Sequence, residues 1–227
     1  DESRLEMVQF HQNYSYEDFI MGYRPDGSGF KLTDGIFYKF CQTVANQPDK
    51  DFFFIIDEIN RGNMSKIFGE LLMLIEKDSR GTKAILAYSG TAFSVPKNLY
   101  IIGMMNTADR SLAMIDYALR RRFSFFEMEP GFNSDGFKAY QASLQNETFN
   151  ALIEQVIDLN REIKMDDSLG EGFRIGHSYF CGQETCTEEW MKSVVYYDII
   201  PMLQEYWFDD KQKVQRWENN LSGVFNG

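Results

Sequence analysis

The feature that most constrains this fold is an unbroken apolar run, residues 52–56 (FFFII), followed directly by Asp57 and Glu58. The run has the length of a strand and no polar alternation, so it predicts a strand that is covered on both faces. Strands of this kind form parallel sheets flanked by helices, and such sheets bind ligands beyond their carboxyl ends. The sequence therefore predicts an α/β fold with two carboxylates at its ligand-binding edge.

The two carboxylates suit metal-assisted phosphate chemistry. In nucleoside triphosphatases with a phosphate-binding loop, an Asp in this position supports Mg²⁺ and a neighbouring carboxylate orients the attacking water. Asp57 fits the first role and Glu58 the second. On these residues alone, a strand that simply ends in two solvated acids is an equally good interpretation.

Strand and helix patterns alternate through the first half of the chain. Strands are predicted at 7–11, 99–105 and 123–130, a hairpin at 84–96 around Gly90, and helices within 30–47, 65–81 and 111–122. After Pro130 only helical patterns remain, at 149–163, at 187–208 with a break at Pro201, and at 211–221. We therefore predict an α/β core at residues 1–131 and a helical lid at residues 132–227.

A second polar cluster, NTADRS, follows the apolar segment 99–105. Asn106 can hydrogen-bond an attacking water or a phosphate oxygen without adding negative charge, and Asp109 and Arg110 follow it closely. A turn before a helix capped by Ser111 would use the same residue types, so this alternative stays open.

Three consecutive arginines, Arg120, Arg121 and Arg122, end the helix predicted at 111–122. Cations in the last turn of a helix favour its dipole and need no further role. An arginine presented to a neighbouring subunit can also neutralise charge on a γ-phosphate during hydrolysis. Because adjacent helical residues point in different directions, we expect one or two of the three to reach a nucleotide.

Composition excludes several classes of protein. Lys and Arg minus Asp and Glu gives 23 − 34 = −11, opposite in sign to a stand-alone polyanion-binding domain. The cysteines Cys41, Cys181 and Cys186 lack CxxC spacing, which predicts reduced thiols in a cytoplasmic protein and no zinc site. No apolar run is long enough to span a membrane. The first residue, Asp1, suggests an internal fragment.

Longer segments of the chain resemble a known family. They are VQFHQNYSYEDFIMGYRP, GIFYKFC, IIDEINRGNMSKIFGELLMLIEKD, NLYIIGMMNTADRSLAMIDYALRRRFSFFEMEPGF and GFRIGHSYF. Together they cover nearly the whole chain and closely resemble the McrB-like AAA+ GTPases, of which MNTADRS is a specific signature. The resemblance implies a mostly parallel AAA+ sheet flanked by helices, followed by an all-α lid.

The resemblance also implies a function. McrB-like proteins are ring-forming motors that hydrolyse GTP with Mg²⁺, and they drive DNA translocation in 5-methylcytosine-dependent restriction systems. A separate nuclease subunit, McrC, and a DNA-reading N-terminal domain complete such a system. By motif, Asp57 and Glu58 correspond to Walker B, Asn106 to sensor 1, and Asp109 and Arg110 to the rest of the signature.

Further residues are assigned by the same resemblance. Arg121 and Arg122 are the better arginine-finger candidates. In GFRIGHSYF, Arg174 is a candidate nucleotide sensor of the lid and His177 a weaker one, although a packed turn explains the segment equally well. Tyr14 and Tyr16, in NYSYEDF, are expected to pack or to contact another subunit, with the DNA path as an alternative.

The phosphate-binding loop GxxxxGK[ST] of that family does not occur in this sequence. Its amides and lysine cradle the nucleotide phosphates, so we expect this chain alone to bind GTP or ATP weakly or not at all. In the family that loop follows a central strand, whose lack would leave exposed strand edges. The fold class is therefore a truncated AAA+ core followed by a helical lid.

Two other functions remain possible at this point. A dynein-related or MoxR-like AAA+ ATPase that remodels other proteins would share the features at Asp57, Glu58 and Asn106. A regulatory or scaffolding AAA+ domain without turnover is the non-enzyme alternative. The segments MNTADRS and GHSYF favour the McrB-like assignment over both.

Overall fold

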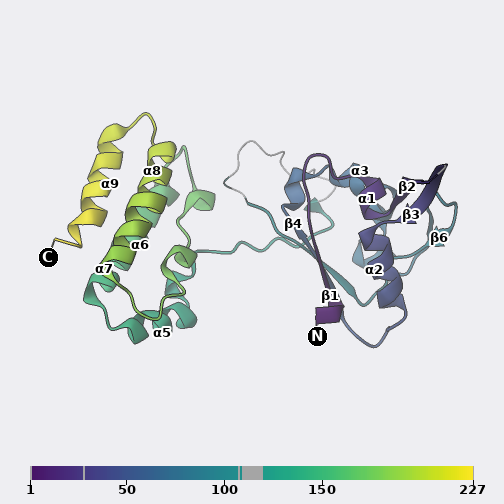
Figure 1. Ribbon diagram of the computed structural model, residues 1–227, viewed down its shortest axis with the longest axis horizontal. Helices are drawn as coiled ribbons and strands as arrows, with labels where there is room; N and C mark the ends of the chain where they lie inside the picture. The colour runs from purple at the N-terminus through teal and green to yellow at the C-terminus, as the bar shows by residue number, and fades with distance from the viewer. Residues whose placement is uncertain (1, 28, 107, 109–119, 227) are drawn as a thin grey trace. The chain divides into compact units, whose positions relative to one another are not determined.

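The computed structural model describes residues 2–27, 29–106, 108 and 120–226, and the chain divides into two compact units, Asp1–Phe125 and Phe126–Gly227 (Figure 1). We call them the core unit and the lid unit. The division lies shortly before Gly131, where the sequence analysis set the boundary. Each unit encloses its own hydrophobic core.

A parallel sheet forms the centre of the core unit. Its strands are β1 (Leu5–Gln9), β4 (Phe52–Asp57) and β7 (Leu99–Gly103), in the order β1-β4-β7. Gln9 is the partner of Asp57 across β1 and β4, and Ile56 is the partner of Gly103 across β4 and β7. The α/β class and the apolar strand before Asp57 are therefore confirmed.

Helices cover one face of this sheet. They are α1 (Tyr16–Phe19), α2 (Ile36–Ala45) and α3 (Met64–Phe68), whose apolar residues join one cluster with the strands. Aromatic rings from the helices pack on those of β4, in the pairs Phe19–Phe54, Phe37–Phe54 and Phe40–Phe52, with centroids 5.7, 5.0 and 5.9 Å apart. This packing explains why the even-numbered apolar residues of β4 are buried.

The opposite face of the sheet is apolar and accessible. Leu5 and Tyr100 are both 50% exposed, and the rings of Phe53 and Tyr100 stack with centroids 5.5 Å apart. Within the described part of the chain, β7 is an edge strand with Ile102 also exposed. A parallel strand with apolar residues on both faces is normally covered on both. The exposure agrees with the open sheet that the sequence analysis expected.

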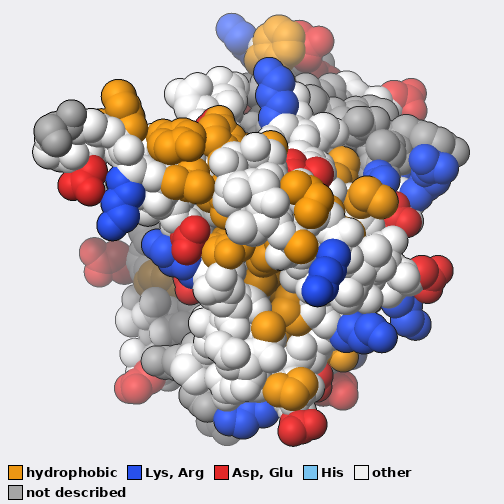
Figure 2. Space-filling view, turned by 90° about the vertical axis from the view of Figure 1, so that its right-hand side faces the viewer, with side chains coloured by type: hydrophobic (Ala, Val, Ile, Leu, Met, Phe, Trp, Pro, Cys, Tyr) orange, Lys and Arg blue, Asp and Glu red, His pale blue; other side chains and the backbone are white. Residues whose placement is uncertain are grey.

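A hairpin replaces the start of the helix predicted at 30–47. Residues of β2 (Met21–Asp26) pair antiparallel with β3 (Gly29–Asp34) around Gly27, whose φ is +56°. Tyr23 of β2 and Phe30 of β3 are both exposed. Figure 2 views the molecule from the right-hand side of Figure 1 and shows hydrophobic side chains gathered on that face. The Asp-Gly turn signal thus outweighs the helical spacing, and α2 starts only at Ile36.

Two other predicted elements of the core unit differ in the structure. The helix expected at 65–81 ends at Phe68, because Gly69 has φ +50°, and a 3-10 turn (Gly69–Met73) follows. The strand expected at 123–130 is not formed, and Phe126 is 88% exposed. A strand needs a partner for its amides and carbonyls, and no described strand pairs with these residues.

The remaining short elements of the core unit agree with the sequence. The hairpin at 84–96 forms from β5 (Ala84–Ile85) and β6 (Ala92–Phe93), with Gly90 at φ +67°. Short 3-10 turns occur before β1, after β4 and before β5, at Glu2–Arg4, Ile59–Arg61 and Lys77–Ser79. The helix predicted at 111–122 lies mostly outside the described residues.

Helices make up the lid unit. They are α5 (Asp135–Leu144), α6 (Glu147–Met165), α7 (Glu188–Ser193), α8 (Ile200–Tyr206) and α9 (Lys211–Gly223). Four of them begin where a side-chain oxygen accepts a backbone N–H of the first turn, at Ser134, Asn146, Thr187 and Asp210. The three 3-10 turns of this unit are Gly131–Asn133, Glu171–Phe173 and His177–Phe180. The all-α lid is confirmed.

The helix predicted at 187–208, with a kink or break at Pro201, is not broken there, since residues 188–206 are continuously helical. A π-helical turn, Val194–Ile199, separates α7 from α8, and Pro201 lies in the first turn of α8. Proline has no N–H to donate and therefore disrupts the regular helical hydrogen bonds before it.

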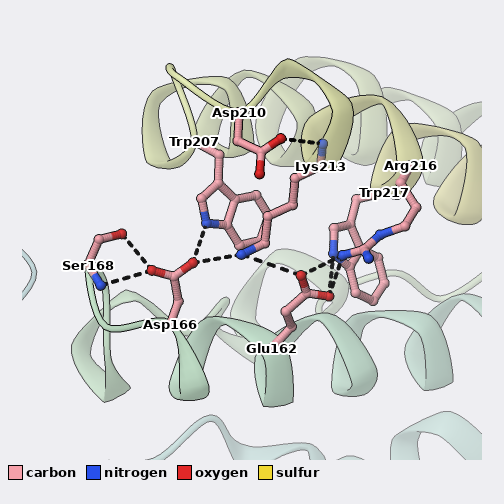
Figure 3. Close-up of polar contacts among 8 residues, drawn as sticks. All are labelled: Glu162, Asp166, Ser168, Trp207, Asp210, Lys213, Arg216 and Trp217. Atoms are coloured by element: carbon pink, nitrogen blue, oxygen red, sulfur yellow. Dashed lines mark hydrogen bonds and ion pairs between the residues drawn. The ribbon is translucent and has the colours of Figure 1, made fainter.

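Figure 3 shows how α9 is held on α6, through Lys213 between Glu162 and Asp166.

Candidate active site at the carboxyl edge of the sheet

Strands β4 and β7 stay paired beyond their last regular residues. The Met104 amide donates to the Ile56 carbonyl at 2.8 Å, and the Ile59 amide donates to the Met104 carbonyl at 2.9 Å. These two hydrogen bonds bring the segments that follow both strands to the same edge of the sheet. Asp57 ends β4 and Asn106 follows β7, so each lies beyond the carboxyl end of a strand, as the sequence predicted for each.

A glycine permits this close approach. A Cβ built on Gly103 would lie 2.5 Å from Cδ1 of Ile59, so the buried Ile59 side chain occupies the space above β7. Ile59 in turn begins the short 3-10 turn after Glu58. The sequence gives no direct sign of this contact, because it joins residues from two separate motifs.

Asp57 is fixed by its backbone neighbours. Its carbonyl accepts from the Phe10 amide at 2.9 Å, and its Oδ1 accepts from the Glu58 amide at 3.0 Å. Gln9 Nε2 donates to Asp57 Oδ2 at 3.4 Å from the neighbouring strand. The contact of Gln9 with Asp57 was not predicted from the sequence. It follows from the register of β1 against β4, which pairs these two residues. One Oδ atom keeps lone pairs for a further partner.

Glu58 has an uncommon backbone conformation. Its φ and ψ are 50° and 44°, in the left-handed region, where residues other than glycine are uncommon and often functional. Its side chain is 20% exposed, and Oε2 lies 3.1 Å from Nε of Arg61 in an ion pair. Arg61, in the same motif, had no role in the prediction. The ion pair fixes the direction of the Glu58 side chain.

Asn106 opens the second motif and is exposed. Its Oδ1 accepts from the Ala108 amide at 3.0 Å. This contact is the turn that the alternative interpretation required, and it also fixes the direction of the side chain. Asp109 and Arg110 lie outside the described residues.

The arginines at the end of the core unit differ in environment. Arg122 forms an ion pair with Glu76 at 2.8 Å and lines a small cavity of about 220 Å³ beside β7. Arg120 and Arg121 are exposed. Of the two preferred finger candidates, Arg122 is thus held inside its own unit and Arg121 lies at the surface.

The lid candidates contact other lid residues. Arg174 bonds Glu127 and Glu129, and the His177 ring accepts a hydrogen bond from the Gly131 amide. Within the lid unit both residues therefore have structural contacts. A role in sensing nucleotide stays a prediction.

The aromatic segment after β1 packs into the core unit. Tyr14 stacks on Phe10 with ring centroids 4.8 Å apart, and burial raises the pKa of Tyr14 to about 12. Tyr16 donates its hydroxyl to Glu70 at 2.7 Å, and Phe19 is fully buried. Packing was the expected role of this segment.

The residues at the sheet edge fit a magnesium nucleotide only in part. Mg²⁺ in nucleotide sites is held by one or two carboxylates together with phosphate oxygens and waters, and Asp57 can supply such a carboxylate. Among the described residues no group of three His, Cys, Asp or Glu side chains could hold a metal by itself. A metal here would therefore depend on the nucleotide.

No helix in the described ranges is long and apolar enough to cross a membrane.

Comparison with known proteins agrees with this geometry. The family model of the AAA domain, dynein-related subfamily, matches residues 1–123, more than half of the chain. The chain belongs to this AAA family. The model of the McrB alpha-helical lid domain matches residues 151–215, so this is an McrB-like member.

Two curated relatives of this McrB-like chain belong to restriction systems. The type IV methyl-directed restriction enzyme EcoKMcrB subunit of Escherichia coli (strain K12) is 54% identical over 232 residues, covering 97% of this chain and 50% of that protein. The type II restriction enzyme BsuMI component YdiS of Bacillus subtilis (strain 168) is 28% identical over 186 residues, covering 64% of this chain and 54% of that protein. The McrB-like chain thus spans about half the length of both relatives.

Proposed function

We propose that this chain is part of a GTP-driven motor in a restriction enzyme that acts on DNA containing 5-methylcytosine. The observation that carries the proposal is the edge formed by β4 and β7, where Asp57, Glu58 and Asn106 emerge together. The similarity to a methyl-directed restriction subunit supports the substrate class. The activity belongs to the whole protein, of which this chain would be one part.

Each residue at the edge has a proposed role. Asp57 would support Mg²⁺ bound to the β- and γ-phosphates, through the carboxylate oxygen that Gln9 only weakly engages. Glu58 would orient and activate the attacking water, and its ion pair with Arg61 would hold its side chain in place for that task. Asn106 would hydrogen-bond the same water or a γ-phosphate oxygen through its amide group. Asp109 and Arg110 would complete this side of the site.

Hydrolysis would need a neighbouring subunit. We assign the arginine finger to Arg121, which is exposed, and a structural role to Arg122, which is paired with Glu76. The proposal therefore includes a homo-oligomeric ring, in which one subunit completes the site of the next. A McrC-like nuclease subunit and DNA are the proposed partners of that ring.

The decisive experiment measures hydrolysis in an extended protein that carries a phosphate-binding loop in addition to this chain. Glu58→Gln should reduce GTP turnover at least a hundredfold while leaving GTP binding intact, because only activation of the water is lost. Arg61→Ala is the matched second variant, and a smaller decrease is expected since the carboxylate remains. Unchanged turnover in Glu58→Gln would favour a scaffolding domain instead.

The same extended protein can be used to compare the hydrolysis of GTP with that of ATP. A higher kcat/KM for GTP than for ATP supports the McrB-like motor, whereas a clear preference for ATP favours a remodelling ATPase of the dynein-related subfamily. Mixed rings test the finger, because Arg121→Ala subunits should poison their wild-type neighbours and Arg122→Ala should mainly lower the melting temperature.

The chain alone should bind nucleotide weakly, since the amides and lysine of a phosphate-binding loop are not in its sequence. Isothermal titration with GTPγS and Mg²⁺ tests this point directly. A dissociation constant in the micromolar range or below would contradict it and would require a different phosphate cradle within these residues.

A further inference from the structure

We propose that Arg174 and His177 form a clamp that fixes residues 127–131 to the lid unit, so that the joint between the two units is confined to the residues before Glu127. We call this arrangement the linker clamp. It needs no nucleotide, and it therefore does not rest on the proposed function. All of its contacts lie within Phe126–Gly227.

His177 holds the last residue of the clamped segment. The Gly131 amide donates to His177 Nδ1 at 2.9 Å, and a Cβ built on Gly131 would lie 2.9 Å from His177 Cε1. The imidazole therefore sits directly on the glycine backbone, and the ring packs edge-on to Phe132 and Phe137 with centroids 6.2 and 5.9 Å away. A larger residue than glycine would push the segment off the ring.

Arg174 holds the first residues of the segment. Its Nη2 lies 3.2 Å from Glu127 Oε1 and its Nη1 lies 3.5 Å from Glu129 Oε1, so the two arms of the guanidinium take two carboxylates. Its Nε donates to the Glu171 carbonyl at 3.0 Å, and its side chain is only 11% exposed. Glu127 and Glu129 can share one partner because alternate residues of an extended segment point to the same side.

A buried asparagine supports both clamp residues. Asn160 of α6 is 7% exposed, and its Nδ2 donates to the Ile175 carbonyl at 2.9 Å while its Oδ1 accepts from the Ile175 amide at 2.6 Å. Ile175 lies between Arg174 and His177 in the sequence. A buried side chain that uses both its polar atoms on one residue fixes the backbone at that point. The clamp residues thus project from a rigid site on a long helix.

The clamp has a mechanical consequence. Residues 124–126 form no regular structure, and the exposed Phe125 and Phe126 have no place in either hydrophobic core. If residues 127–131 belong to the lid, only this short stretch is left to absorb changes in φ and ψ when the lid moves. The joint therefore ends before Glu127, whereas the boundary predicted from the sequence at Gly131 would include residues 127–131 in it.

The test is amide exchange and ¹⁵N relaxation of the full 227-residue chain. In the wild type, residues 127–131 should relax like the helices of the lid, and residues 124–126 should be the most mobile of the region. His177→Ala should increase exchange at the Gly131 amide about tenfold, as expected for one lost hydrogen bond. His177→Asn, which retains an acceptor close to the position of Nδ1, should restore most of the protection.

The acidic side of the clamp is tested separately. Glu127→Gln with Glu129→Gln removes both charges from exposed positions and should increase the mobility of residues 127–129 while the lid remains folded. Arg161→Ala is the matched control for Arg174→Ala, because Arg161 is also an ion-paired arginine of the lid, with Asp158 on α6 as its partner. The control should leave residues 127–131 unchanged.

Two results would overturn the proposal. One is a wild-type chain in which residues 127–131 are as mobile as 124–126. The other is unchanged mobility of these residues in both the His177→Ala and the doubly substituted glutamate variants. If Arg174→Ala or His177→Ala unfolds the lid, the glutamate variant still decides, since its side chains lie at the surface.

Discussion

Lys213 Nζ lies 2.7 Å from Asp166 Oδ2 and so ties the start of α9 to the end of α6 (Figure 3). The same ammonium lies 4.2 Å from the centre of the Trp207 ring, and the Trp207 Nε1 donates to Asp166 Oδ2 at 2.8 Å. One carboxylate thus receives two donors that come from different helical segments.

We predict that Asp166→Asn destabilises the lid by roughly 1–2 kcal/mol, because the charge-assisted contact with Lys213 is lost in a partly buried place. All three tryptophans of the chain, Trp190, Trp207 and Trp217, belong to the lid, so tryptophan fluorescence during urea unfolding reports on this unit. Asp158→Asn is the control, since its exposed pair with Arg161 should contribute little.

The same carboxylate predicts an acid dependence. The hydrogen bonds from Lys213 and then Ser168 hold the pKa of Asp166 well below its usual value of 3.8. A lowered pKa contributes stability that is fully present above pH 4 and is lost as the pH falls towards the pKa of the folded state. The wild-type lid should therefore weaken below about pH 4. Asp166→Asn should show a flatter profile there, and parallel profiles would contradict the prediction.

A substitution at Gly35 should be far more damaging. A Cβ at this position would lie 2.4 Å from the Phe19 carbonyl carbon and 2.6 Å from the Ile20 nitrogen, and neither backbone atom can move aside. Gly35→Ala should cost more than about 3 kcal/mol or prevent folding of the core unit. Gly29→Ala, where the added methyl meets nothing within 4 Å, is the control. Circular dichroism melting curves compare the two, and equal melting temperatures would refute the clash.

Arg80 should tolerate no replacement by lysine. Its Nε donates to the Ile75 carbonyl at 2.9 Å, and its Nη1 donates to the Leu99 carbonyl at 2.9 Å and the Pro96 carbonyl at 3.4 Å. A compact ammonium cannot span these acceptors, so Arg80→Lys should cost about 1–3 kcal/mol. The exposed Arg24 pairs with Asp18 and serves as the control, Arg24→Lys. Urea midpoints followed by far-ultraviolet dichroism measure the difference.

The thiols should report separately on the two units. Burial raises the pKa of the Cys41 thiol far above its usual range and raises that of Cys186 to about 11. Thiolate is the reactive form, so Cys41 in the core unit should resist a thiol reagent until that unit opens, while Cys181 and Cys186 react earlier. Mass spectrometry of labelled peptides orders the three sites. Early labelling of Cys41 would show that the core opens readily.

Much of this fold could be predicted because its signals are local. The apolar run before Asp57 and the glycine at position 90 each specify an element within a few residues, and α6 shows its buried stripe directly. The position of Asp57 and of Asn106 beyond the ends of strands was predictable from the apolar segments before them. The pairing of β4 with β7 was not predicted and is a finding of the structure.

The features that sequence reasoning missed depend on distant partners. Residues 123–130 have the alternation of a strand, but a strand forms only beside another one. The contact of Gln9 with Asp57, and the contacts of Arg174 with Glu127, join residues far apart in the chain. Composition and spacing do not encode such pairs. The ion pair of Arg122 with Glu76 is another such contact. Three consecutive arginines gave no sign of which one would form it.

The two hydrophobic cores of this chain share no residue, and residues 125 and 126 form the covalent connection between the units. Folding cooperativity is therefore expected to stop at that connection, so that heat or urea can melt one unit while the other keeps its native structure. An unfolded lid unit could then refold while the core unit stays native. In an assembly of many copies, the lid unit of one subunit could unfold and refold while that subunit stays bound in the assembly.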